Sequence, residues 1–257
     1  MMSSSTQIRQ YGFGDNVSTP LYLFTKDADI KKHSAYTAAK AGDISAAIEL
    51  ISDFALGFIY ANRQQFSKNH IFVAPHAREA SGDNAIPQVL AEVCALVMGA
   101  KADTDIVQIT RVFHTGADPM ERMNLRAQFE GAVVPHGQYV LVDDVTSLGG
   151  TLAELANYIQ TKGGQVAHIL VLVNAGRTTR FKPETKTIRL LEKRFSHEIT
   201  EIFGITPTAL TANEASYLVG FRTPEFDSLR QQITDLSNKN KNLAAVFGIF
   251  VVARFFA

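Results

Sequence analysis

The sequence predicts an α/β fold, in which a parallel β-sheet is flanked by helices and followed by a C-terminal helical extension. Two stretches, residues 71–98 and residues 139–161, carry this prediction. Each contains a short apolar run, then a loop of small and polar residues, then an apolar pattern with helical spacing. Because such unbroken apolar runs are typical of strands covered on both faces, the sheet is expected to be parallel.

The N-terminal part is expected to contribute an edge strand and a helical cover for the sheet. Residues 1–20 are expected to be disordered or peripheral, and residues 21–24 fit an edge strand. Asp43 is a suitable N-cap for an amphipathic helix over residues 44–66, whose apolar side would pack on the sheet. A buried strand over residues 71–74 and a helix over about 85–98 follow.

The middle of the chain continues this alternation. Residues 105–109 are expected to form a third strand, and the polar, glycine-containing connection over 110–119 fits a mobile lid. A strand over residues 140–142 leads into a helix over 152–161. Residues 166–173 then read as another buried strand.

Helical patterns dominate from residue 184 onward, with further helices expected over 212–217 and 224–236. We therefore expect two parts. Residues 1–180 form the α/β domain with its N-terminal helical cover, and residues 181–257 form a helical extension that serves dimerisation or partner binding.

Composition narrows the classes of partner. The 25 basic residues balance the 25 acidic residues, so no basic excess favours direct contact with nucleic acid. Cys94 is the single cysteine, which excludes disulfides within the chain and cysteine-based zinc sites and fits a reducing cytoplasm. Residues 243–257 are apolar but shorter than the roughly 20 residues of a span, and Arg254 interrupts them, so no membrane contact is expected.

The most informative stretch is residues 139–152, which reads YVLVDDVTSLGGTL. The apolar run is expected to end at Asp143 and Asp144, and a loop rich in hydroxyls and glycine leads into a helix. Such a loop directs backbone N–H groups at an anion, the helix dipole favours negative charge there, and glycine permits close approach. Two adjacent carboxylates at a strand end suit ribose hydroxyls or Mg²⁺, which prefers oxygen ligands.

An apolar run followed by D-D-x-x-[ST]-x-G-G-T resembles the signature with which type I phosphoribosyltransferases bind 5-phosphoribosyl 1-diphosphate (PRPP). The resemblance implies that Asp143 and Asp144 hold the ribose and Mg²⁺. It implies a phosphate loop made of Ser147, Leu148, Gly149, Gly150 and Thr151. The family usually places a second hydroxyl residue directly before the first glycine, where this chain has Leu148. An ordinary turn with capping residues is the alternative.

The same resemblance assigns roles to two further loops. In the family, the loop after the first strand contacts pyrophosphate, which here implies Ala77 and Arg78, with His76 close by. The lid supplies basic groups that meet the diphosphate during reaction, for which Arg111 and His114 are the candidates, Arg111 as a catalytic residue. A solvated loop histidine is the alternative for His76.

Within the family, the ComF-like phosphoribosyltransferases are most similar, over residues 71–173. Like them, this chain has a first strand that ends in proline, a Gly-x-Asn before the first helix and an R-x-N-x-x-x-x-F segment. These correspond to Pro75, Gly82, Asn84, Arg122, Asn124 and Phe129. The zinc-binding cysteines typical of ComF proteins are absent. Arg122 and Arg126, four apart in a segment predicted to be helical, would share a face, where they either bind phosphate or pair with nearby acids.

The resemblance implies a Mg²⁺-dependent, PRPP-binding enzyme that acts on a nucleobase, or on a nucleotide in reverse. Asp143 and Asp144 would stabilise an oxocarbenium-like ribose, Arg78 and Arg111 the leaving diphosphate, and Ser147 would lie near the nucleophile. A homo-oligomer is expected. Three alternatives remain open: a hydrolase of nucleotide N-glycosidic bonds, a non-enzymatic sensor of PRPP or nucleotide, and an accessory protein of DNA processing.

Overall fold

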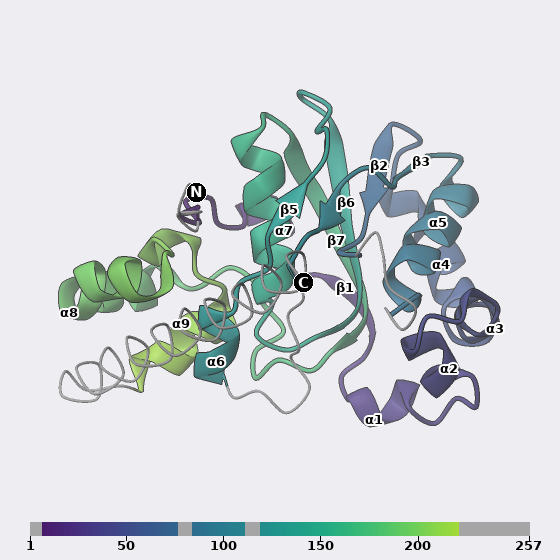
Figure 1. Ribbon diagram of the computed structural model, residues 1–257, viewed down its shortest axis with the longest axis horizontal. Coiled ribbons are helices and arrows are strands. Elements are labelled where there is room, and N and C mark those ends of the chain that lie inside the picture. Colours follow the sequence, from purple (N-terminus) through teal and green to yellow (C-terminus); the bar gives the residue numbers. More distant parts are fainter. Residues whose placement is uncertain (1–6, 77–83, 111–118, 221–257) are drawn as a thin grey trace, which may run out of the picture.

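The computed structural model describes residues 7–76, 84–110 and 119–220 of the 257-residue chain. At its centre lies a five-stranded parallel sheet in the order β1-β7-β6-β2-β3 (Figure 1). Its strands are β1 Leu21–Phe24, β2 His70–Val73, β3 Lys101–Asp103, β6 Gln138–Thr146 and β7 Gln165–Asn174. A separate antiparallel pair consists of β4 Val107–Gln108 and β5 Phe129–Glu130. The predicted fold class is confirmed, and β1 is the edge strand that the sequence predicts.

Helices cover both faces of the sheet. Their bounds are α1 Asp27–Ile30, α2 Tyr36–Lys40, α3 Ile44–Phe54, α4 Leu56–Asn62, α5 Ile86–Met98, α6 Pro119–Asn124, α7 Gly150–Thr161, α8 Thr185–Phe203 and α9 Ala212–Val219, with 3₁₀ turns at Asp15–Val17, Arg63–Gln65 and Pro207–Ala209. Helices α3, α4 and α5 lie on one face and α7 on the other, while α6, α8 and α9 form a further layer beside α7 (Figure 1).

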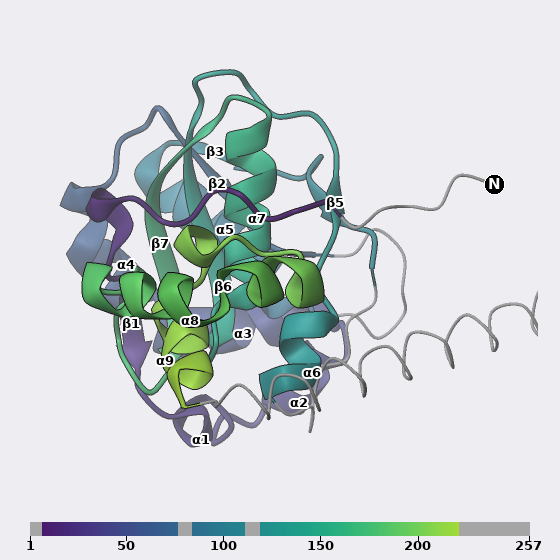
Figure 2. The ribbon, with the colours of Figure 1, turned by 90° about the vertical axis from the view of Figure 1, so that its left-hand side faces the viewer.

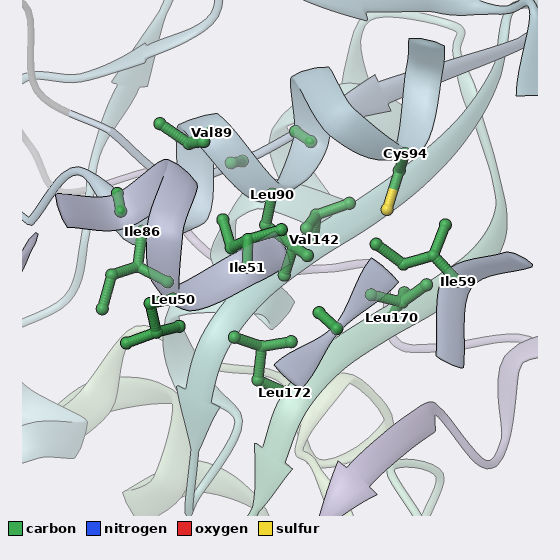
Figure 3. Packing of buried hydrophobic residues seen from close by; sticks show 14 of the residues in the cluster. Leu50, Ile51, Ile59, Ile86, Val89, Leu90, Cys94, Val142, Leu170 and Leu172 are labelled. Atoms are coloured by element: carbon green, nitrogen blue, oxygen red, sulfur yellow. The ribbon is translucent and has the colours of Figure 1, made fainter. Parts of the chain in front are cut away.

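Side chains of β6 alternate between two apolar cores. Val140 and Val142 pack with α3 and α5, whereas Leu141 packs against α7. Figure 3 shows the first of these cores, in which Val142 meets Leu90 and Cys94. Burial raises the pKa of the Cys94 thiol to about 12, so this cysteine is an uncharged core residue.

A third apolar core joins α6, α8 and α9. It contains Met123 from α6, Leu191 and Ile199 from α8, and Leu218 from α9. Helix α8 is kinked at Phe195, whose φ of −145° departs from helical values. The helical character predicted for residues 184–219 is confirmed. The division of the chain at residue 180 stays a prediction, and residues 221–257, including the expected helix over 224–236 and the apolar tail, lie outside the described residues.

Residues 7–20 are anchored to the domain by buried side chains, which corrects, for this part of the chain, the expectation that residues 1–20 are disordered or peripheral. Arg9 is fully buried, and it pairs in parallel with Ile205 through a backbone bridge. The backbone N–H groups of Gln10 and Tyr11 donate to Asn157 Oδ1 on α7, at 2.9 and 3.0 Å. Figure 2 shows this segment crossing in front of α7. Its neighbours Ile8, Gln10 and Tyr11 are exposed, so nothing in the local sequence indicates that the charged residue Arg9 is buried.

Two predicted elements have different bounds. The helix expected over 44–66 begins at the Asp43 cap as predicted, but it breaks at Ala55 into α3 and α4, which meet at 57°. Ala55 and Ile59 are both fully buried, so the bend keeps α4 on the core. Not every apolar residue of α3 faces the core, because Ile48 is 48% exposed.

The third strand of the main sheet is β3, not residues 105–109. Asp103 Oδ1 accepts the backbone N–H groups of Asp105 and Ile106, at 2.9 and 3.0 Å. This aspartate turn carries the chain out of the main sheet, so residues 107–108 pair with β5 instead.

Among the residues that the structure describes, no single helix is both long and apolar enough to cross a membrane; the bent pair that starts with α3 meets the criterion by length and composition only.

Candidate functional site

The glycine loop lies between β6 and α7, at the carboxyl end of the sheet, as predicted. Gly149 adopts a left-handed conformation with φ of +79°, and a Cβ atom there would lie 2.8 Å from the Phe181 ring. Both features require glycine. No hydrogen bond found within the described parts of the chain uses the backbone N–H groups of residues 148–151. These donors are therefore available to an anion at the N-terminus of α7.

The paired acids face opposite ways, which corrects the expectation that they end the strand together. Strand β6 continues to Thr146, because Asp143 pairs with Val171 and Val145 with Val173 of β7. Adjacent residues within a strand point to opposite faces. Asp143 lines a pocket together with the glycine loop, whereas Asp144 lies on the face covered by α5 and α2.

Asp144 is buried and has partners at both of its carboxylate oxygens. Its Oδ2 atom lies 2.8 Å from Lys40 Nζ on α2 and 3.0 Å from Asn84 Nδ2, while Oδ1 accepts the N–H of Val145 at 2.8 Å. Only 4% of the Asp144 side chain is exposed. With both oxygens occupied, Asp144 positions α2 and the start of α5 against the strand, and it is not open to a ligand.

Asp143 lines the loop pocket. The pocket has a cavity volume of about 100 Å³, and its lining includes Arg122, Ser147 and Thr151. Burial raises the pKa of Asp143 well above its usual range, and the neighbouring Asp144 carboxylate raises it further. A carboxyl group kept in such a place gains from a cation or a ribose hydroxyl, and strongly shifted pKa values cluster at functional sites.

In Lys40, the charge of a neighbouring residue outweighs the effect of burial on the pKa. Burial alone would lower the pKa of its ammonium group, but the charge of Asp144 and the hydrogen bond to it outweigh burial, so the pKa is raised. Lys40 is therefore charged at neutral pH. Of the two adjacent acids, Asp143 is therefore the one that lines the pocket, together with Glu154 and Glu214, which pair with arginines.

Arg122 contacts the loop from helix α6, whereas Arg126 lies beyond the end of that helix. Helix α6 ends at Asn124, so the two arginines do not share a helical face as predicted. Arg122 Nη1 donates to Ser147 Oγ at 2.8 Å. Arg126 makes a two-pronged contact with Glu154, at 2.7 and 2.8 Å, and its remaining donors bind backbone carbonyls of Gln7, Phe203 and Gly204.

A buried charge network lies behind the loop and was not predicted. Arg9 bridges Glu154 on α7, at 3.2 Å, and Glu214 on α9. Gly150 permits this arrangement, since a Cβ atom there would lie 3.1 Å from Glu214 Oε1. One feature of the sequence could have indicated this network: Glu154 is a charged residue between the apolar positions Leu152 and Leu155 of α7.

Helix α9 anchors the loop from the other side. Thr211 Oγ1 donates to the carbonyl of Leu148 at 2.6 Å, and the same oxygen accepts the N–H of Glu214 in a capping box. The Leu148 side chain packs against the third apolar core. The residue that departs from the family pattern therefore serves contact with the helical extension.

The other predicted site residues divide into two groups. Ala77, Arg78, Arg111 and His114 lie outside the described residues. His76 is described: its Nδ1 atom lies 3.2 Å from the carbonyl of Ala74.

Two of the residues that the ComF-like pattern singles out lie at this site, and another, Gly82, lies outside the described residues. Asn84 binds Asp144 and Arg122 binds Ser147, so two of them touch the paired acids or the loop. Asn124 donates instead to the carbonyl of Met120 at 3.0 Å, and Phe129 is buried within β5.

The donor set fits a single Mg²⁺ ion. Mg²⁺ is commonly bound through one or two carboxylates, with water and substrate phosphates completing its shell. Asp143 offers one half-buried carboxylate beside a loop suited to phosphate. Asp144, expected as a second ligand, is occupied by Lys40 and Asn84.

Another group of possible metal ligands, His33, Glu49 and Asp53, does not fit a metal. His33 Nδ1 accepts the N–H of Ala35 at 3.2 Å, which places the ring proton of the neutral imidazole on Nε2, 3.2 Å from Asp53. Metal binding through Nε2 would move that proton to Nδ1, opposite the N–H of Ala35.

Two curated proteins are similar to the chain in sequence. No family model matches the chain. The chain is 32% identical over 214 residues to Protein TraN of Escherichia coli, covering 80% of the chain and 47% of that protein. It is 36% identical over 137 residues to an uncharacterized protein of Haemophilus influenzae, covering 52% of the chain and 30% of that protein. The chain thus spans about half or less of the length of these curated relatives.

Two solved structures are similar only at low TM-scores. A hypoxanthine phosphoribosyltransferase from Staphylococcus aureus gives a TM-score of 0.30 at 10% identity, covering 46% of this chain and 61% of that one. An adenine phosphoribosyltransferase from Leishmania donovani gives 0.33 at 12% identity, covering 61% of this chain and 84% of that one.

Proposed function

We propose that the chain binds PRPP or a nucleotide in the loop pocket and transfers the ribose phosphate to or from a nucleobase. One observation carries the proposal. Asp143, whose pKa is raised, lines the same pocket as a glycine loop whose N–H groups are unused among the described residues. A ribose phosphate presents the two groups that this pair would bind, namely an anion for the loop and vicinal hydroxyls for the carboxylate.

Each residue of the pocket has a distinct role in this proposal. The N–H groups of residues 148–151 and the hydroxyl of Thr151 bind the 5′-phosphate, with Ser147 oriented by Arg122. Asp143 binds the ribose hydroxyls. Asp144 acts as a positioning residue, because its contacts with Lys40 and Asn84 fix the end of β6.

Asp143 would also hold Mg²⁺, which when bound supplies positive charge to the diphosphate. In the reaction, the bond between ribose C1 and the diphosphate oxygen breaks, and a base nitrogen bonds to C1. The Asp143 carboxylate stabilises the positive charge that develops on the ribose. Arg78 and Arg111 remain the predicted partners of the leaving diphosphate.

The proposal includes membership of the ComF-like branch, supported by the contacts of Asn84 and Arg122 with the acids and the loop. It also includes a cytoplasmic homo-oligomer. Hydrolysis of a nucleotide, sensing without turnover and an accessory role in DNA processing remain the alternatives, and they differ from transfer in whether diphosphate is released from PRPP.

Calorimetry with PRPP and with ribose 5-phosphate, each with and without Mg²⁺, tests the proposal on the full chain. We expect Asp143→Asn to weaken binding at least tenfold, because a charged hydrogen-bond partner is lost. Asp105→Asn, at an exposed position, is the matched control and should bind as the wild type does.

A wild type that binds neither compound would contradict the proposal, as would equal affinities for the wild type and Asp143→Asn. Diphosphate release with PRPP and each nucleobase then separates a transferase from a sensor.

A further inference from the structure

The balanced total charge of the chain conceals an uneven distribution of its basic residues. Residues 177–194 contain seven of the 25 lysines and arginines but only two acidic residues. This segment follows β7 and includes about the first half of α8. Total charge, the basis for expecting no contact with nucleic acid, does not measure such a local excess. The arrangement of these cations on the surface decides what they can bind.

Five of these cations form a basic strip, which consists of Arg180, Lys182, Lys186, Arg189 and Lys193. The first two lie in the loop that leads to α8. On α8 itself, Lys186, Arg189 and Lys193 are spaced by three and four residues, so they share one face of the helix. All three are exposed. The opposite face of α8 packs in the third apolar core, and the helix lies in the outer layer beside α7 (Figure 1).

One end of the basic strip borders a pocket that shares none of its described lining residues with the loop pocket. Arg180, Lys182 and Lys186 line it, and its cavity volume is about 330 Å³. Three hydroxyl residues and one acid complete its polar lining, namely Thr178, Thr187, Ser216 and Glu184. Cationic and hydroxyl side chains are the groups with which proteins commonly contact phosphate oxygens. This end of the strip is therefore suited to a phosphate group.

Two exposed acids approach the strip without neutralising it. Lys182 Nζ lies 2.7 Å from Asp15 Oδ1, and Lys186 Nζ lies 2.8 Å from Glu184 Oε2. The hydrogen bonds from these lysines lower the pKa of both acids, and the charge of Arg180 lowers it further. Because the Asp15 side chain is 94% exposed and that of Glu184 52%, water screens both pairs, and a phosphate can replace either acid.

The other end of the strip has no such acids. Neither Arg189 nor Lys193 forms a hydrogen bond or an ion pair with another residue of the described ranges. Glu192 is next to Lys193 in sequence, but it lies about 100° away around the helix axis. Lys186 and Lys193 are about 10 Å apart along that axis, at 1.5 Å per residue. Cations spread over this length fit a chain of phosphates better than a single phosphate.

The strip offers charge and little else, which identifies the kind of polyanion. Helices that bind anionic membranes also insert an apolar face, but the large apolar residues of α8 other than Leu190 pack in or against the third core. Single-stranded nucleic acid is bound by aromatic rings on which bases stack, and Phe181, the aromatic residue of the segment 177–194, is buried. A duplex requires only contacts between cations and its regularly spaced phosphates.

We propose that the basic strip binds the phosphate backbone of a nucleic-acid duplex without reading its sequence. Arg180, Lys182 and Lys186 bind a phosphate at the pocket, and Arg189 and Lys193 bind phosphates farther along the backbone. Five cations, two of them with exchangeable acids, give about three to five phosphate contacts. This binding does not depend on the proposed transfer of ribose phosphate, because the strip and the loop pocket have no described residue in common.

Fluorescence anisotropy with a labelled DNA duplex of mixed sequence, about two helical turns long, tests the proposal on the full chain without PRPP. The logarithm of the affinity falls with the logarithm of the salt concentration by about 0.9 per phosphate contact. Raising the salt from about 50 to 200 mM should therefore weaken binding roughly 40- to 500-fold. A duplex of unrelated sequence should bind equally tightly, because phosphate contacts carry no sequence information.

The strip variant combines Arg180→Gln, Arg189→Gln and Lys193→Gln, all at exposed positions outside the loop pocket. Three lost contacts should reduce the salt slope by about 2.7 and weaken binding at about 50 mM salt at least tenfold. Thermal unfolding should give the wild-type Tm, which shows that the loss of binding does not come from unfolding.

A matched control variant removes three cations from elsewhere. Lys68, Lys101 and Lys162 are exposed, and they lie at or just before the starts of β2, β3 and β7, at the edge of the sheet opposite to the strip. The variant in which all three are changed to Gln has the same net charge as the strip variant. It should keep the affinity and the salt slope of the wild type.

The absence of duplex binding at about 50 mM salt would overturn the proposal. Equal losses in the two triple variants would also overturn it, because they would show that only net charge matters. Tighter binding to vesicles that contain phosphatidylserine than to the duplex would assign the strip to a membrane instead. Calorimetry with PRPP is expected to give the same affinity for the strip variant and the wild type, so the failure of this proposal and that of the proposed function are distinguishable.

Discussion

Lys40 and Asp144 are 104 residues apart in the chain, and the ammonium nitrogen of one lies 2.8 Å from the carboxylate oxygen of the other. This pair distinguishes Asp144 from its neighbour Asp143. The first acid faces a ligand pocket, and the second connects the helical cover to the sheet. The two substitutions should therefore have separable effects, although the residues are adjacent.

Asp144→Ala should lower the free energy of unfolding by about 1–3 kcal/mol. Removing one partner of a buried pair costs more than that, but the Lys40 side chain is 36% exposed and water replaces part of the contact. Urea unfolding measures the change. In the double variant with Lys40→Met, the loss should be smaller than the sum of the two single losses. Additive losses would show that the pair is not coupled.

Asp143→Asn should stabilise the protein at neutral pH. The native pKa of Asp143 is raised, so the stability associated with its protonated form is complete below the unfolded pKa of about 3.8 and is lost as pH rises through the native pKa. Asparagine does not ionise, so the variant does not lose this stability as the pH rises. The stability difference between variant and wild type should grow from about pH 4 upward, as measured by urea unfolding across a pH series. A difference that stays constant with pH would contradict the raised pKa.

Leu148→Thr should cost stability and gain little affinity. The side chain packs against the core formed by α8 and α9, and replacing it loses about 1–2 kcal/mol of apolar contact. Because that side chain packs against this core, the new hydroxyl is expected to change ribose 5-phosphate affinity by less than about threefold. Leu148→Met conserves volume and should behave as the wild type. A tenfold gain in affinity for Leu148→Thr would instead show that the loop turns toward phosphate.

Thr211→Val should disturb the loop from a distance. The substitution removes both the cap of α9 and the 2.6 Å hydrogen bond to the Leu148 carbonyl, at a cost of about 1–2 kcal/mol. It should also weaken ribose 5-phosphate binding, because the carbonyl that orients the loop is released. Thr211→Ser keeps the hydroxyl and should preserve both properties. Calorimetry and thermal unfolding of the three proteins provide the comparison.

The sequence was most informative where local pattern determines structure. Apolar runs located β2, β6 and β7, and helical spacing located α5 and α7, because these segments are covered by neighbours whatever the details of packing. The glycines at 149 and 150 also located the loop. Glycine has no Cβ atom, so Phe181 can approach Gly149 closely and Glu214 can approach Gly150 closely.

Sequence reasoning failed where a long-range partner decides the outcome. The orientation of Asp143 and Asp144 follows from the pairing of β6 with β7 as far as Thr146, and no property of the two acids reveals where that pairing ends. The pairing of Arg126 likewise depends on Glu154 and on the carbonyls of Phe203 and Gly204, which are distant in sequence. For Arg9, the partner Glu214 is 205 residues away.

That separation has a consequence for synthesis on the ribosome. At roughly 5–20 residues per second, about 10–40 s pass between the addition of Arg9 and the addition of Glu214 to the nascent chain. Until then, the guanidinium that ends up beneath the glycine loop lacks one of its two carboxylates, and Leu148 lacks the helix that receives its side chain. The loop is therefore expected to acquire its final shape among the last parts of the fold, after the sheet that carries it has formed.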